Sequence, residues 1–135
     1  MREIKFRMWD KVAKKYRAID SIAFDRDTGA VKVANGWGED IIEDKDIICH
    51  REPPMFVLEQ FIGRKDINER EIYEGDIVYW LVNTDIEKVA AVYYDDEGAC
   101  FWMGKDRYDN LVINDWMRGE YTVLGNIHEN LELLK

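Results

Sequence analysis

The stretch that decides the fold is QFIGRKDINEREIYEGDIV, residues 60–78. Within it, Tyr73-Glu74-Gly75-Asp76 predicts a tight turn that leads into a strand starting with Ile77. Gly75 supplies a backbone conformation that other residues adopt at a cost, and Asp76 can accept hydrogen bonds from nearby amides. Gly63 ends or kinks the preceding strand. We interpret these as turn residues first, although loop positions also bind ligands in some proteins.

Short strands are predicted on both sides of this stretch, because apolar and polar residues alternate with a period of two and helical periodicity is nearly absent. The turn Asp95–Gly98 predicts a hairpin with Gly98 at positive φ. Residues 129–134 add one helical turn. The spacing favours an all-β barrel or sandwich. The predicted strands cover residues 2–9, 16–24, 31–34, 56–62, 76–82, 87–94, 99–103, 110–113 and 121–127.

The length of 135 residues predicts a single domain, 1–135. Pro53-Pro54 is expected to form a stiff connector between an N-terminal strand region, 1–52, and a barrel region, 55–135. A hydrophobic content of 47% excludes wholesale disorder even at 35% charged residues.

The net charge of −9 is unevenly distributed. Residues 1–18 hold seven basic and two acidic side chains, a balance of +5, and the remainder holds 12 basic and 26 acidic ones, a balance of −14. A nucleic-acid binder needs cations that replace the counterions around phosphates, so we expect no direct nucleic-acid binding. The basic segment is instead expected to pair with acidic surface, within one chain or between subunits.

The chain lacks the residue patterns of common catalytic and metal sites. Ser21 is the sole serine and has no Gly-x-Ser-x-Gly context, and His50 and His128 are the two histidines. Cys49 and Cys100 form no Cys-x-x-Cys pair and are interpreted as small apolar residues of a reduced protein. We therefore predict no catalytic residues, no metal and no cofactor.

No apolar run approaches the ~20 residues that a membrane-spanning helix needs. The start, residues 1–6, alternates charged and apolar residues and lacks the apolar stretch of a signal peptide. The expected location is the cytoplasm, with no membrane association.

Three blocks of the chain resemble the YopX family of phage and prophage proteins: residues 2–10, the segments 60–66 and 71–78, and residues 123–130. The resemblance implies an all-β domain with an SH3-like small barrel and additional strands used in subunit association, and no established enzymatic activity. Its structural motif residues are Trp9, Asp10, Gly63, Asp66, Tyr73, Gly75, Asp76, Gly125 and Asn126.

This chain departs from the family pattern at two positions. An Asn-Gly turn is usual after Lys65-Asp66, whereas here Asn68 is followed by Glu69, and we expect Asn68 itself to adopt the left-handed conformation. Leu131 stands where a proline is common, which favours a more helical tail.

These observations leave three hypotheses for function. The first is a non-enzymatic accessory protein that acts through oligomerisation and by binding a host or phage protein. The second is an acidic nucleic-acid mimic that inhibits a host protein. The third, ranked last, is an enzyme that uses carboxylates such as Glu74 and Asp76. We further expect a homo-oligomer in which residues 2–9, an unpaired strand, contact another subunit. The alternative is that this strand closes the barrel of its own chain.

Overall fold

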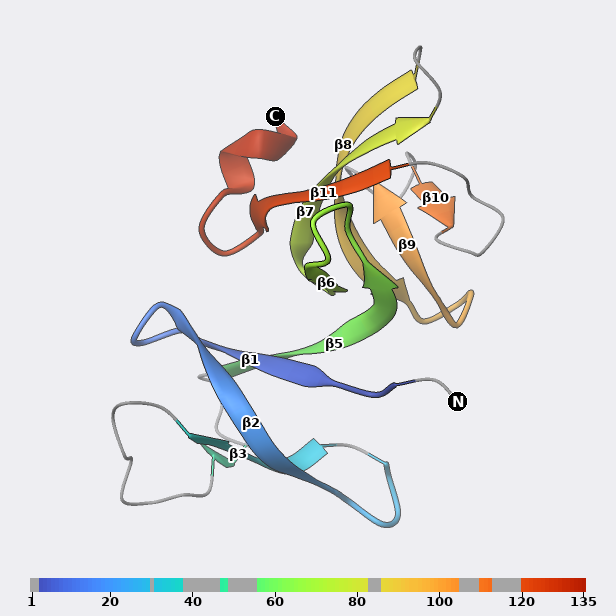
Figure 1. The fold of residues 1–135 in the computed structure, drawn as a ribbon. Helices are drawn as coiled ribbons and strands as arrows, with labels where there is room; N and C mark the ends of the chain where they lie inside the picture. Colours follow the sequence, from blue (N-terminus) through green and yellow to red (C-terminus); the bar gives the residue numbers. More distant parts are fainter. Residues whose placement is uncertain are drawn as a thin grey trace. The chain divides into compact units, whose positions relative to one another are not determined.

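Strands are the main secondary structure of the computed structural model, which describes residues 3–29, 31–37, 47–48, 56–82, 86–104, 110–112 and 120–135 (Figure 1). The predicted all-β class is confirmed, and a short 3-10 helix, η1 (Leu131–Leu134), forms the predicted turn at the end. The strands are β1 (Phe6–Asp10), β2 (Lys15–Phe24), β3 (Val31–Trp37), β4 (Ile47–Ile48), β5 (Phe56–Lys65), β6 (Glu71–Tyr73), β7 (Asp76–Val82), β8 (Ile86–Asp95), β9 (Cys100–Gly104), β10 (Asn110–Val112) and β11 (Glu120–Asn126).

The chain forms two compact units, Lys5–Glu59 and a second one made of Met1–Ile4 with Gln60–Lys135. The division falls within β5, which runs from the first unit into the second. In the first unit the strand order is β4-β3-β2-β1-β5; the second contains β6 beside β5 and a five-stranded sheet, β10-β9-β8-β7-β11. The Pro53-Pro54 connector lies outside the described residues. The single domain and the SH3-like form of the barrel stay predictions.

Asp10 holds the hairpin turn between β1 and β2. Its Oδ1 accepts hydrogen bonds from the backbone N–H groups of Val12 and Ala13, and its Oδ2 accepts one from Arg17 Nε at 2.7 Å. Burial raises the pKa of Asp10, but these donors outweigh it and lower the pKa below its ordinary value. The carboxylate therefore fixes both the turn and the first cross-strand ion pair.

Apolar residues of β1 alternate between two surroundings, as the period-two pattern predicts. Met8 is buried against Ile19, Ile22 and Phe56. Trp9 lies opposite Tyr16 in the β1–β2 register and meets its ring edge-to-face at 4.9 Å between centroids.

The expectation of an unpaired N-terminal strand is wrong, because β1 lies between β2 and β5. The buried Glu59 of β5 accepts hydrogen bonds from Arg7 Nε at 3.0 Å and from the Tyr16 hydroxyl at 2.9 Å. These bonds link the hairpin to a strand some 50 positions later, which a local pattern does not reveal. Two cations of the basic segment, Arg7 and Arg17, are thus paired with carboxylates inside their own unit.

The core of the Gln60–Lys135 unit consists of residues that face one another across neighbouring strands. Val78 lies opposite Ala90 and Val123, and Val92 lies opposite Met103. The full cluster is Ile72, Val78, Trp80, Ala90, Val92, Met103, Tyr121 and Val123. β7, β8, β9 and β11 therefore each contribute one inward face, as alternation requires.

Asp66 joins two segments that lie far apart in the sequence. Its Oδ1 accepts hydrogen bonds from the N–H groups of Asn68 and Arg70, and its Oδ2 accepts one from Val123 N–H of β11 at 3.0 Å. Burial raises its pKa, but the donors at Val123, Arg70 and Asn68 outweigh burial and lower the pKa. Since the folded pKa is below the unfolded one, this carboxylate stabilises the fold above about pH 4, and the contribution is lost as the pH falls through the lowered pKa.

The next residue extends this attachment, because Ile67 N–H donates to the Tyr121 carbonyl at 2.8 Å. The segment 66–70 therefore lies along the edge of β11 that β7 leaves unpaired. In this way a short turn covers a strand edge that would otherwise offer free backbone groups.

Gly75 forms the turn that opens β7. Its φ of 81° is in the region that favours glycine. Its N–H donates to the Val92 carbonyl, and its own carbonyl accepts from Ile127 N–H, both at 2.8 Å. Asp76 Oδ2 accepts the Tyr73 N–H at 2.9 Å. The central motif is thus a turn bonded to both β8 and the end of β11.

The C-terminal motif is held by two asparagines. Asn126 Oδ1 accepts hydrogen bonds from His128 N–H and Glu129 N–H, and Asn130 Oδ1 accepts one from Asn126 N–H. Asn130 lies so close to Gly125 that a β carbon at position 125 would overlap its side chain. Gly125 is therefore required by close approach.

Two expectations about positive φ are wrong. In the hairpin between β8 and β9 the positive φ belongs to Ala99, at 50°, and not to Gly98. Gly98 instead passes close to Asp95, where a β carbon would come within 2.7 Å of Oδ2. In the segment after Asp66, the left-handed residue is Glu69, with a φ of 63°, and not Asn68, whose N–H is held by Asp66 Oδ1.

Gly63 kinks β5 and does not end it. Its φ is 89°, and the β5–β6 register shifts between Phe61 and Lys65. This irregularity explains why β5 continues to Lys65, three residues beyond its predicted end.

Replacing the exposed Glu69 by glycine should raise the free energy of unfolding by about 1 kcal/mol, because glycine adopts a positive φ without a β-carbon penalty. Urea denaturation measures the change. Glu69→Ala is the matched control and should give no such gain, since alanine keeps the β carbon. An equal gain from both variants would attribute the effect to the lost charge and not to the backbone.

Candidate binding site in the Gln60–Lys135 unit

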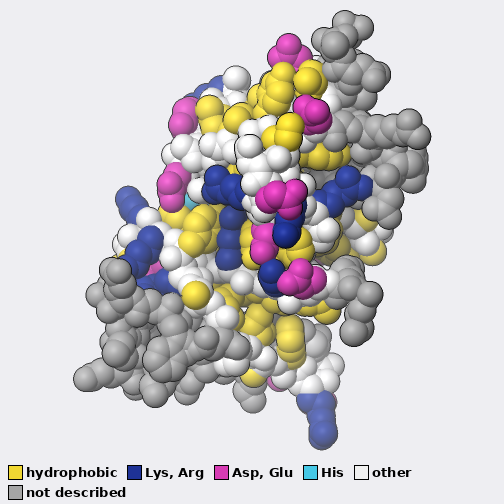
Figure 2. Space-filling view, in the orientation of Figure 1, with side chains coloured by type: hydrophobic (Ala, Val, Ile, Leu, Met, Phe, Trp, Pro, Cys, Tyr) yellow, Lys and Arg dark blue, Asp and Glu magenta, His cyan; other side chains and the backbone are white. Residues whose placement is uncertain are grey.

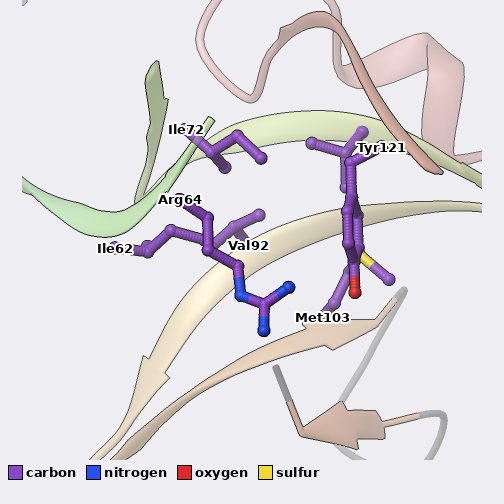
Figure 3. Close-up of a pocket in the computed structure, with 7 residues that line it drawn as sticks. Ile62, Arg64, Ile72, Val92, Met103 and Tyr121 are labelled. Atoms are coloured by element: carbon purple, nitrogen blue, oxygen red, sulfur yellow. The ribbon is translucent and has the colours of Figure 1, made fainter. Parts of the chain in front are cut away.

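A narrow apolar pocket lies within the core of this unit (Figure 3). Its empty space measures about 180 Å³ with open solvent included, and it is too narrow to admit a water molecule. Six strands contribute to its lining: β5 with two residues, and β6, β7, β8, β9 and β11 with one residue each. The lining residues are Ile62, Arg64, Ile72, Val78, Val92, Met103 and Tyr121.

Two buried donors of this core have no hydrogen-bond partner, and one of them, the Tyr121 hydroxyl, belongs to a residue that lines the pocket. Tyr121 is 6% exposed and Trp80 is 7% exposed, and neither the Tyr121 hydroxyl nor Trp80 Nε1–H is bonded to any described residue. The two residues lie opposite each other in the β7–β11 register, and their rings stack with centroids 6.2 Å apart. A buried polar group without a partner costs about 1–3 kcal/mol, so each of these two groups lowers the stability of the fold.

Arg64 brings a positive charge to the same pocket. Figure 3 shows the guanidinium of Arg64 and the hydroxyl of Tyr121 on the same side of the pocket, away from Ile72. Burial raises the pKa of Tyr121, and the charge of Arg64 opposes this rise. The hydroxyl is therefore a neutral donor near a cation at neutral pH.

The lining of this pocket contains two polar side chains, Arg64 and Tyr121. Apart from Tyr121 and Arg64, the lining is aliphatic or Met, so a nucleophile and base in hydrogen-bond contact are not among these residues. A tyrosine with a raised pKa is a poor base at neutral pH. The two polar groups of the lining, the Tyr121 hydroxyl and the Arg64 guanidinium, are both hydrogen-bond donors.

The residues predicted from the sequence lie elsewhere. Trp9 and Asp10 belong to the β1–β2 hairpin, and the other seven lie at bends, turns and strand ends of the Gln60–Lys135 unit. None of these seven residues lines the pocket, although each lies within a few positions of a lining residue in the sequence. The seven are Gly63, Asp66, Tyr73, Gly75, Asp76, Gly125 and Asn126. Our sequence reasoning did not select Arg64 or Tyr121. The sequence did contain a signal: Arg64 lies two positions after Ile62, and residues two apart on a strand face the same side of the sheet. An apolar Ile62 that faces the core therefore indicates that Arg64 faces the core as well.

The other candidates for chemistry give no second site in the part of the chain that the structure describes. There, no group of three or more His, Cys, Asp and Glu side chains is placed to hold a metal ion. Cys100 is a free thiol that accepts the indole N–H of Trp102. Cys49 and His50 lie outside the described residues. Among the described residues no helix has the length and hydropathy needed to cross a membrane.

Tyr121→Phe should leave the free energy of unfolding unchanged or raise it by about 1 kcal/mol, because the variant removes an unpaired buried hydroxyl and keeps the ring. Thermal or urea unfolding measures this change. Tyr73→Phe is the control, since the Tyr73 hydroxyl donates to Glu71 Oε2 at 2.9 Å, and its removal should lower stability slightly. A loss at position 121 as large as the loss at position 73 would show that the Tyr121 hydroxyl has a partner.

Two solved structures have a fold similar to that of this chain. The chain is 25% identical to protein EF1440 from Enterococcus faecalis, with full coverage of both chains and a TM-score of 0.68. It is 17% identical to protein yopX from Bacillus subtilis, covering 100% of this chain and 98% of that one, with a TM-score of 0.63. No curated protein matches the chain. The YopX protein family matches residues 5–135, so the chain belongs to the YopX family.

Proposed function

We propose that this protein is a non-enzymatic accessory protein of a phage or prophage, which acts in the bacterial cytoplasm by associating with copies of itself and binding a host or phage protein. The observation that carries the proposal is the separation of charge along the chain. Residues 1–4 with 60–135 hold 9 basic and 17 acidic side chains, a net charge of −8, whereas residues 5–59 have a net charge of −1.

The hairpin turn between β1 and β2 supplies a basic contact surface. Lys11 and Lys14 are exposed in this turn, and Val12 between them is 68% exposed. Among the described cations of this segment, Arg7 and Arg17 already pair with carboxylates of their own unit, whereas Lys11 and Lys14 are exposed in the turn and are the cations that we expect to contact another molecule. The acidic residues of a second copy are a complementary partner for them. Figure 2 shows basic and acidic side chains intermingled with apolar ones on one face of the molecule.

The carboxylates considered for catalysis have structural bonds, which favours a binding role. Glu74 Oε1 accepts the Gln60 N–H, and Asp76 Oδ2 accepts the Tyr73 N–H, both at 2.9 Å. A catalytic carboxylate needs access to a substrate proton or carbon. Both of these are instead acceptors within the turn that opens β7.

A second candidate is an acidic mimic of nucleic acid, which the net charge of −8 on residues 1–4 and 60–135 supports. Such a protein would occupy a basic site on a host enzyme. Displacement of duplex DNA from a basic host protein by the full chain would favour this candidate. Self-association without displacement would favour the first one.

Lys11→Glu/Lys14→Glu should weaken self-association by about tenfold or more, because two attractive contacts with acidic surface become repulsive. Sedimentation equilibrium at two salt concentrations measures the dissociation constant of self-association, and added salt should weaken the wild-type assembly as well.

The matched control is Lys65→Glu/Lys135→Glu, which changes the net charge equally at two other exposed lysines. If self-association weakened equally in both double variants, the effect would come from the change in net charge and not from the β1–β2 turn. A wild-type chain that is monomeric at tens of micromolar would contradict self-association.

A further inference from the structure

Exposed apolar side chains are concentrated at the end of the chain, where η1 follows β11 (Figure 1). Four of the nine large apolar side chains that are exposed among the described residues lie within residues 124–133, and each is more than one-third exposed. They are Leu124, Ile127, Leu131 and Leu133. Single exposed apolar residues are ordinary on a protein surface, whereas a group of them marks a contact surface.

Two asparagines hold these residues in one compact segment. Asn130 N–H donates to the Asn126 carbonyl at 2.9 Å, and Asn130 Oδ1 accepts the Asn126 N–H. The Asn130 side chain also lies directly against Gly125. The end of β11 and the start of η1 are therefore fixed side by side, and the η1 side chains are not buried. We call the four apolar residues, with Glu129 and Glu132, the C-terminal surface.

The charges of the C-terminal surface define its partner. Glu129 and Glu132 are exposed on either side of Leu131 in the sequence, with Lys135 at the far end of η1. They belong to the unit whose net charge is −8. A complementary partner therefore carries an apolar side chain between two positive charges.

The β1–β2 turn has this arrangement. Val12 is exposed between Lys11 and Lys14, and the two lysines are three positions apart, as are the two glutamates. Asp10 holds the turn, because its Oδ1 accepts the N–H groups of Val12 and Ala13 and its carbonyl accepts the Lys14 N–H at 2.8 Å. A loop that is ordered before binding loses little conformational entropy in the contact.

A second acidic turn of the same unit matches the lysines less well. Asp96 and Glu97 are exposed in the hairpin between β8 and β9. The exposed apolar side chain of this hairpin, Tyr94, already packs edge-to-face on Phe101, with 5.4 Å between ring centroids. This turn therefore offers charge without a group of unpacked apolar side chains, and it serves as the control surface.

We propose that the β1–β2 turn of one copy docks on the C-terminal surface of a second copy. Val12 packs against the exposed leucines, and the two lysines of the turn lie next to Glu129 and Glu132. This inference rests on the proposed self-association and names the surface that receives the turn. The contact joins two different surfaces, so each copy offers one of each kind.

A charge swap tests the pairing directly by sedimentation equilibrium of the full chain. Glu129→Lys/Glu132→Lys should weaken self-association about tenfold or more, as should Lys11→Glu/Lys14→Glu, because each variant places like charges against each other. An equimolar mixture of the two variants should associate with a dissociation constant within about threefold of the wild-type value. In the mixture the reversed turn meets the reversed surface, and the unaltered turn meets the unaltered surface.

The apolar part of the contact has its own test. Leu131→Ser/Leu133→Ser should weaken self-association about tenfold, because two exposed apolar side chains no longer leave water in the assembly. Ile4→Ser is the control, since Ile4 is 61% exposed and lies outside the C-terminal surface, and its dissociation constant should equal that of the wild type.

The control for charge is Asp96→Lys/Glu97→Lys, which changes the net charge as Glu129→Lys/Glu132→Lys does and should associate like the wild type. Equal weakening by these two variants, or a mixture of the swapped variants that stays monomeric, would overturn the docking. If the wild type associates in those cases, the proposed self-association stands without this contact. A monomeric wild type at tens of micromolar would overturn both.

Discussion

The carboxylate of Asp66 is the interaction on which the Gln60–Lys135 unit depends. One oxygen organises the segment 66–70 through Asn68 and Arg70, and the other accepts the N–H of Val123, 57 positions away in the sequence. Because the same segment also bonds the Tyr121 carbonyl, it fixes β11 from the side opposite to β7. A single buried anion thus closes the edge of the sheet, with backbone donors in place of a paired cation.

This closure also fixes the position of Tyr121 in the core. Tyr121 is held inward because its own carbonyl and the N–H of Val123 are tied to the segment 66–70. The fixed backbone leaves the hydroxyl next to the charge of Arg64, with burial raising its pKa. Strand β11 therefore belongs to both the fold and the candidate site. Its edge is bonded to the segment 66–70, and its inward face carries the Tyr121 hydroxyl, a donor without a partner.

Local patterns predicted the all-β class, the turn at Gly75 and the helical turn after Asn130, because alternation and turn residues act over a few positions. Contacts between distant segments were not accessible in this way. Nothing near Phe6–Asp10 indicates that Glu59 binds Arg7 and Tyr16 and makes β1 an interior strand. Likewise, the left-handed position fell on Glu69 because Asp66 holds the N–H of Asn68. The candidate site was missed for the same reason, since Arg64 and Tyr121 line one pocket from two strands, β5 and β11, that lie far apart in the sequence.

The central claim is that Asp66 holds β11 in place, and amide hydrogen exchange at Val123 tests it most directly. In the wild type the Val123 N–H should be about as protected as amides in β8. In Asp66→Asn, which keeps one carbonyl oxygen for the segment 66–70, exchange at Val123 should accelerate about tenfold or more while amides of β8 and β9 keep their protection. Equal exchange of the Val123 N–H in the two proteins would contradict the account.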